Sequence, residues 1–180
     1  MEMVHGLTFI AAASKPDSAR RWEAEERARR KRVERFHRLT LLQHEDLTEE
    51  ERAVLHLIDR QLHDPHPVFS DKHCPQCGKP LSVVTVRNLR IDCCRQCRGI
   101  WFDPGELQML SGLSKEIPSN HLAHRHSRYR CPVCQAEMEE YVFLNPRNLL
   151  VDRCPNGHGV YLEDRELERV FEIVEGEKRR

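Results

Sequence analysis

Two cysteine pairs decide the fold of this chain: Cys74-Pro75-Gln76-Cys77 and, beginning 17 residues after Cys77, Cys94-Arg95-Gln96-Cys97. In each pair two residues separate the cysteines, so one turn presents two thiolates to the same ion. Two such turns close a four-coordinate tetrahedral site of the kind that structural zinc occupies. The spacing therefore predicts a zinc site formed by Cys74, Cys77, Cys94 and Cys97.

The same pattern occurs a second time in the chain. Cys131-Pro132-Val133-Cys134 repeats the first pair at an offset of 57 residues, and Arg147–Cys154 matches Arg87–Cys94 in kind at six of eight positions. Gly157 takes the place of Cys97 and has no side chain, so the adjacent His158 is expected to supply the fourth ligand. The repeat predicts a second site formed by Cys131, Cys134, Cys154 and His158, and hence two zinc ions per chain.

Two alternatives to this assignment stay open. Cys93 has Arg153 as its counterpart in the repeat, which predicts a non-ligand beside the ligand Cys94; the alternative is a redox-responsive thiol that exchanges with Cys94. If His158 were not a ligand, the second site would be open for catalysis, with Glu163 or Asp164 as the nearest acidic group. Because closed four-ligand sets are structural, we expect no enzyme, no catalytic residues and no small-molecule substrate.

The composition agrees with small modules that metal ions stabilise. Of the 180 residues, 39% are hydrophobic and 32% are charged, which is too little apolar material for one large core. No apolar run reaches the length of about 18 residues that a membrane helix needs, so we expect no membrane contact. The stretch 7–14 lacks the preceding Lys or Arg of a secretory signal. We therefore expect a cytoplasmic protein, in which clustered cysteines bind metal rather than form disulfides.

Alternating apolar residues predict short strands around each cysteine pair. The predicted ranges are 81–86, 89–91 and 100–102 in the first copy, and 140–144, 149–151 and 160–162 in the second. Asp103-Pro104-Gly105-Glu106 is typical of the start of a helix. Another helix near 163–175 would place its apolar residues on one face: Leu167, Val170, Phe171 and Val174. These elements predict a small metal-stapled α+β fold.

The stretch Cys94–Leu107, with Cys74–Leu81 upstream, resembles the bacterial zinc-ribbon family named for its similarity to the ribbon of transcription factor IIB. The resemblance is close over about 72–110. It is more distant over about 129–170, where Tyr161 stands in place of a tryptophan. The resemblance implies two tandem zinc ribbons, the second divergent, each with short β-hairpins and a C-terminal helix. It also implies zinc binding and a nucleic-acid or transcription-related role.

The first 73 residues contain no cysteine, and a helical N-terminal arm is expected within them, over residues 17–66. Residues 15–38 hold ten basic and five acidic residues with a thin apolar stripe. This pattern is typical of a solvated helix, of a helix that docks on nucleic acid or an acidic protein, or of a membrane-surface helix. Thr48 and Glu51 form a capping box ahead of a second helix over about 48–63. Whether this helix folds back on the first or forms a homodimer stays open.

The predicted organisation has five parts: an N-terminal segment 1–16, a helical arm or hairpin 17–66, a zinc ribbon 71–111, a linker 112–128 and a second zinc ribbon 129–176. The linker holds His121, His124 and His126. No acid or cysteine among them completes a third metal site. With the arginines beside them, they are more typical of a phosphate or acidic-surface contact than of a metal site, and a simple solvated linker is the favoured interpretation.

The net charge is zero but unevenly distributed, with +5 over 71–130 from ten basic and five acidic residues, and −4 over 131–180. Candidate nucleic-acid contacts are therefore the arginines of the first ribbon and the basic run of the arm: Arg87, Arg90, Arg95, Arg98, Arg29, Arg30, Lys31 and Arg32. The first hypothesis is a non-catalytic adaptor that contacts nucleic acid or a transcription or translation machine. The alternatives are a protein-interaction module, favoured by the scarcity of aromatics for base stacking, and a thiol or zinc redox sensor.

Overall fold

The computed structural model describes residues 47–113, 125–143 and 149–179. Residues Asp46–Arg180 form one compact unit. The helix predicted at 15–38 lies outside the described residues, together with Arg29, Arg30, Lys31 and Arg32. His121 and His124 of the linker also lie outside them.

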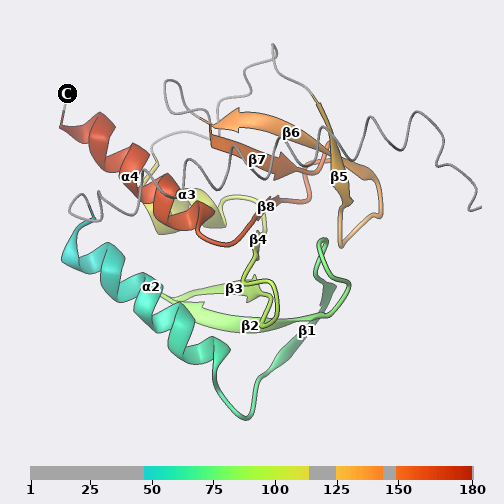
Figure 1. The fold of residues 1–180 in the computed structure, drawn as a ribbon, viewed down its shortest axis with the longest axis horizontal. Helices are drawn as coiled ribbons and strands as arrows, with labels where there is room; N and C mark the ends of the chain where they lie inside the picture. Colours follow the sequence, from blue (N-terminus) through green and yellow to red (C-terminus); the bar gives the residue numbers. More distant parts are fainter. Residues whose placement is uncertain (1–46, 114–124, 144–148, 180) are drawn as a thin grey trace, which may run out of the picture. The chain divides into compact units, whose positions relative to one another are not determined.

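Strands dominate the described part of the chain, and three helices accompany them (Figure 1). The first copy contains β1 (Phe69–His73), β2 (Pro80–Val86), β3 (Leu89–Cys93), β4 (Ile100–Phe102) and helix α3 (Glu106–Ser111). The second contains β5 (Arg125–Arg130), β6 (Glu137–Phe143), β7 (Leu149–Arg153), β8 (Val160–Leu162) and helix α4 (Glu166–Lys178). Helix α2 (Glu49–Leu62) precedes both copies. None of these described helices combines the length and the apolar character needed to cross a membrane.

All the strands join in one antiparallel sheet with the order β1-β2-β3-β4-β8-β7-β6-β5. Each copy supplies four consecutive strands, and the two halves meet at the centre. There, β4 pairs antiparallel with β8, so that Trp101 lies opposite Tyr161 and Phe102 opposite Val160. The duplicated sequence therefore gives a nearly symmetrical sheet whose central contact joins corresponding strands.

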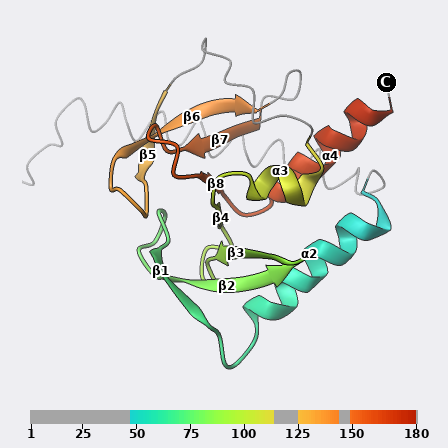
Figure 2. The ribbon, with the colours of Figure 1, turned by 180° about the vertical axis from the view of Figure 1, so that it is seen from behind.

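The side chains of the sheet alternate between two faces, as the pleat of a strand requires. Ile100 and Phe102 of β4 lie in a core cluster with residues of α2, α3 and α4, whereas Trp101 between them lies in a second cluster with the cysteines. Figures 1 and 2 show the helices to one side and the loops that join β1 to β2 and β5 to β6 toward the other. One face is thus a helix-covered core and the other carries the candidate metal centres.

Helix α2 begins with the predicted capping box: the Thr48 side chain accepts from the backbone N–H of Glu51, and the Glu51 carboxylate accepts from the backbone N–H of Thr48 at 2.8 Å. The helix packs on the first half of the sheet rather than standing apart from it. Val54 and Ile58 join the core cluster, and Gln61 bonds both the N–H and the carbonyl of Thr85 in β2, at 3.0 and 2.8 Å. Residues 47–62 are therefore part of the folded unit that contains both ribbons.

The structure confirms the α+β class and the predicted short strands, but not two separate modules of hairpin plus helix. The two copies share one continuous sheet, because the edge of β4 that would be unpaired in a single copy pairs with β8. Two strands, β1 and β5, have no counterpart among the predicted elements, and β5 begins at Arg125, within the stretch predicted as linker. All four residues of the predicted apolar face of α4 are buried: Leu167, Val170, Phe171 and Val174.

Candidate metal centres

Two tight turns position the cysteines of the first ribbon. In the turn after β1, the N–H of Cys74 donates to the carbonyl of Lys79 at 2.7 Å, and Gly78 returns an N–H to the carbonyl of Cys74 at 2.8 Å. The turn after β3 repeats this arrangement, with Cys94 N–H donating to Gly99 O and Arg98 N–H to Cys94 O. Gly78 and Arg98 both have positive φ, at 72° and 61°, which lets each turn close within a few residues.

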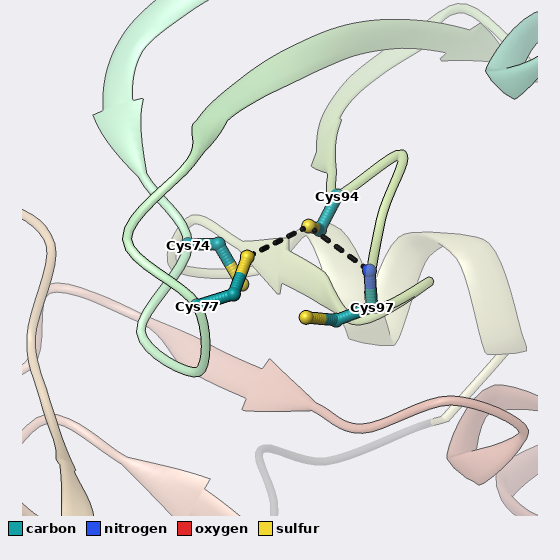
Figure 3. A group of neighbouring side chains, drawn as sticks. All are labelled: Cys74, Cys77, Cys94 and Cys97. Atoms are coloured by element: carbon teal, nitrogen blue, oxygen red, sulfur yellow. Dashed lines mark hydrogen bonds between the residues drawn. The ribbon is translucent and has the colours of Figure 1, made fainter.

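These turns bring four sulfurs together (Figure 3). The Sγ atoms of Cys74, Cys77, Cys94 and Cys97 all lie within 4.8 Å of one another. Cys77 Sγ lies 3.5 Å from Cys94 Sγ, and the backbone N–H of Cys97 points at Cys94 Sγ over 3.3 Å. Zinc–sulfur bonds of about 2.3 Å in a tetrahedron require sulfurs about 3.8 Å apart, so this donor set fits zinc.

The second ribbon assembles a mixed group of donors. The Sγ atoms of Cys131, Cys134 and Cys154 and a ring nitrogen of His158 lie within 4.8 Å of one another. Cys134 Sγ lies 3.6 Å from Cys154 Sγ, and Nδ1 of His158 lies 3.4 Å from Cys154 Sγ. Gly157, with φ at 76°, turns the chain so that His158 reaches the position that Cys97 takes in the first ribbon. Three sulfurs and one imidazole nitrogen also form a zinc donor set.

Hydrogen bonds within each group favour a thiolate, which is the form that binds metal. The hydrogen bond between Cys74 and Cys94 lowers the pKa of Cys74 to about 5 despite the opposing effect of burial, and it raises the pKa of Cys94, so one thiolate of this pair is favoured. In the second group, the backbone N–H of Ala136 and then the side-chain amide of Asn156 lower the pKa of Cys134 to about 6. Burial raises the pKa of Cys131, so a cation is needed before the whole group ionises.

Cys93 takes no part in either group of donors. It is fully buried in the helix-covered core, on the face of the sheet opposite to Cys94. Burial raises the pKa of its thiol above the usual value. The expectation of a non-ligand beside Cys94 therefore agrees with the fold. The exchange of Cys93 with Cys94 does not, because Cys93 at the end of β3 and Cys94 directly after it lie in different clusters on opposite faces of the sheet.

The acidic residues considered for an open second site have other partners. Glu163 Oε1 accepts from the Tyr129 hydroxyl at 2.7 Å and from Arg128 at 3.0 Å. Asp164 forms an ion pair with Arg98 at 3.4 Å. Neither belongs to a group of metal donors within the described residues. The geometry therefore favours the closed set with His158.

A buried aromatic cluster, which the sequence reading did not anticipate, lies between the two groups of cysteines. It contains Trp101, Tyr129 and Tyr161, with Tyr129 and Tyr161 packed edge to face at 5.3 Å between centroids. The hydroxyl of Tyr161 lies 3.5 Å from Cys74 Sγ. The repeat could have indicated this cluster, because Tyr161 corresponds to Trp101 and each is the second residue of a predicted strand.

Three of the four candidate nucleic-acid contacts in the first ribbon bind other parts of the chain. Arg95 donates to the carbonyls of Leu62 and Asp64, at 2.8 and 2.9 Å. Arg98 pairs with Asp59 at 2.7 Å as well as with Asp164. Arg87 donates to Leu110 O and pairs with Glu50 (both contacts at 3.3 Å). The fourth, Arg90, is exposed on β3.

Comparison with known proteins agrees with this arrangement. Residues 73–111 and 130–173 both match the family described as transcription factor zinc-finger. No curated protein and no solved structure matches the chain. Each matched segment contains one complete group of four donors. Two tandem segments of the chain therefore match the zinc ribbon of the transcription factor zinc-finger family.

Proposed function

We propose that the chain is a non-catalytic adaptor in which two structural zinc ions hold one sheet as a platform for a macromolecular partner. The observation that carries this proposal is the closure of both groups, since four donors within 4.8 Å form the full tetrahedral set. Zinc would be held by Cys74, Cys77, Cys94 and Cys97, and by Cys131, Cys134, Cys154 and His158. When bound, the metal supplies folding free energy, on the order of 10 kcal/mol per site in small zinc peptides.

The first candidate partner is a protein component of a nucleic-acid machine, in keeping with the family's description. Arg87, Arg95 and Arg98 form hydrogen bonds or ion pairs with the chain's own groups, which reduces their availability to phosphates. At the edge of the sheet, Val68 and Phe69 expose 64% and 54% of their surface. Exposed apolar side chains beside an edge strand suit a protein surface better than a phosphate backbone.

The second candidate is direct contact with nucleic acid. Its support is the exposed Arg90, the charge of +5 over residues 71–130 and the basic run within 15–38. Such contact depends on ion pairing with phosphates and therefore weakens steeply as salt increases.

The experiment uses the zinc-loaded full-length chain as bait, with and without nuclease. We expect a protein partner that survives nuclease treatment, that Phe69→Asp no longer captures, and that Met109→Asp, altered at another exposed apolar residue, still captures. A low-salt gel shift tests the second candidate, with Arg90→Glu as the informative variant. If capture required nucleic acid and Arg90 while Phe69→Asp had no effect, the second candidate would replace the first.

A further inference from the structure

Tyr161 belongs to the second ribbon, but its hydroxyl lies in the metal centre of the first. Its oxygen lies 3.5 Å from Cys74 Sγ and 3.3 Å from Oε1 of Gln76, and the residue has no exposed surface. The pairing of β4 with β8 carries it there, because Tyr161 stands opposite Trp101 at the centre of the sheet.

Each ribbon places one aromatic ring against the other ribbon, and two glycines leave room for these rings. A Cβ on Gly99 would lie 2.0 Å from the Tyr161 hydroxyl oxygen, and a Cβ on Gly159 would lie 2.7 Å from Cζ2 of Trp101. The backbone carbonyls of the same two glycines accept hydrogen bonds from the N–H groups of Cys94 and Cys154. These bonds close the second turn of each ribbon. Each ring therefore lies against the turn that holds two ligands of the other ribbon.

The chemistry of the contact determines which of the two groups donates the hydrogen bond. A thiolate bound to metal has no proton and only accepts, whereas a tyrosine hydroxyl keeps its proton below about pH 10. Gln76 Oε1 competes for that proton, but the charged sulfur is the stronger acceptor. Tyr161 therefore donates to Cys74 Sγ when the first centre is filled.

We infer that Tyr161 is a positioning residue for the first metal centre and that it couples the two centres, so that metal in either one strengthens binding in the other. Metal in the second ribbon orders the turn that leads into β8 and so fixes Tyr161 beside Cys74. Coupling between binding sites is reciprocal, so filling the first centre raises the affinity of the second by the same factor. The inference rests on the metal centres of the proposed function and not on the partner.

The test uses the full-length chain loaded with cadmium, because cadmium NMR gives separate resonances for a centre of four sulfurs and one of three sulfurs and a nitrogen. Competition with a chelator then measures each centre individually. In Tyr161→Phe, which keeps the ring, we expect the affinity of the four-sulfur centre to fall about 10-fold and its resonance to shift, as for the loss of other outer hydrogen bonds to metal ligands.

The matched control is Tyr129→Phe. Tyr129 packs against Tyr161, but its hydroxyl donates to Glu163 and not to a sulfur. It should leave the four-sulfur resonance and affinity at their wild-type values. Gly99→Ala, which displaces the Tyr161 hydroxyl, should reproduce the loss seen in Tyr161→Phe.

The coupling is measured in His158→Ala, which disables the second centre. We expect the first centre to lose affinity by about 5-fold or more, and to lose little further when Tyr161→Phe is added. An unchanged first centre in Tyr161→Phe, or an equal loss in Tyr129→Phe, overturns the positioning role. An unchanged first centre in His158→Ala overturns the coupling. Binding of fewer than two metal ions by the wild-type chain would instead count against the proposed function.

Discussion

Two adjacent cysteines at the end of β3 illustrate how one residue of register decides between two roles. Cys93 and Cys94 are adjacent in sequence, yet one lies in the helix-covered core and the other in the metal centre. Successive side chains of a strand point to opposite faces, so only one of two adjacent cysteines reaches a given ion. The repeat already indicates which one, because Arg153 replaces Cys93 while Cys154 matches Cys94.

We therefore predict that Cys93→Ala binds two zinc ions per chain and unfolds more easily, by about 1 to 2 kcal/mol, because a buried side chain is shortened. Metal analysis and thermal unfolding monitored by circular dichroism measure the two effects. Cys94→Ser is the comparison, and it should lose one zinc ion. Loss of zinc in Cys93→Ala, or faster metal release under peroxide in wild type than in Cys93→Ala, would support the thiol-exchange alternative instead.

At the scale of elements, the sequence predicts the apolar strands and helices well and the polar strands poorly. Helix α2 and strands β2, β3, β4 and β8 follow from capping and apolar alternation. Strands β1 and β5 read Phe-Ser-Asp-Lys-His and Arg-His-Ser-Arg-Tyr-Arg, in which charged residues obscure the alternation. Such composition suits an edge strand, whose outer side meets solvent.

The metal ligands are well predicted from the sequence because the short spacing within each ligand pair is a local property of the chain. The contacts of Arg87, Arg95 and Arg98 are not local. They join residues between 23 and 66 positions apart, so charge counting alone assigned these side chains to an outside partner. These hydrogen bonds and ion pairs connect the first ribbon to α2, to α3 and to the second ribbon, and they form only when these elements pack together.

Helix α4 begins with a partly buried carboxyl that folding makes less acidic. Glu166 Oε2 accepts the backbone N–H of Glu163 at 2.8 Å. Burial, and then the nearby charge of Glu163, raise the pKa of Glu166 well above its usual value of 4.5. A carboxyl with a raised pKa is favoured in its protonated form in the folded state, so its ionisation at neutral pH destabilises the protein.

Glu166→Gln should therefore raise the melting temperature at pH 8, since the amide oxygen still accepts the Glu163 N–H but carries no charge. The gain should shrink as the pH falls through the raised pKa of Glu166 toward 4.5, because the wild-type carboxyl then becomes neutral too. Melting curves of zinc-loaded protein between about pH 8 and pH 5.5 measure it. Glu137→Gln, altered in a surface ion pair with Arg130, should give no such gain. A constant difference across that range would contradict the assignment.

At the scale of the whole molecule, the two ribbons share one sheet and one helix-covered core, so we expect them to unfold together. Trp101 is fully buried at the centre of the sheet and reports on both halves. In a Trp22→Phe variant, Trp101 fluorescence and far-ultraviolet circular dichroism should give the same midpoint. Excess chelator should expose Trp101 and abolish the transition, because zinc supplies much of the folding free energy. Two separate midpoints would show that the ribbons fold independently.

The pairing of β4 with β8 also has a consequence for how the fold depends on protein concentration. Because the repeat makes these corresponding strands lie side by side in antiparallel orientation, a single copy of the ribbon would present the same edge to a second molecule and complete the sheet as a symmetric dimer. Two copies in one chain convert that association into an intramolecular step, whose effective concentration is set by the connecting segment and not by expression level. The pairing of the two ribbons therefore does not depend on protein concentration.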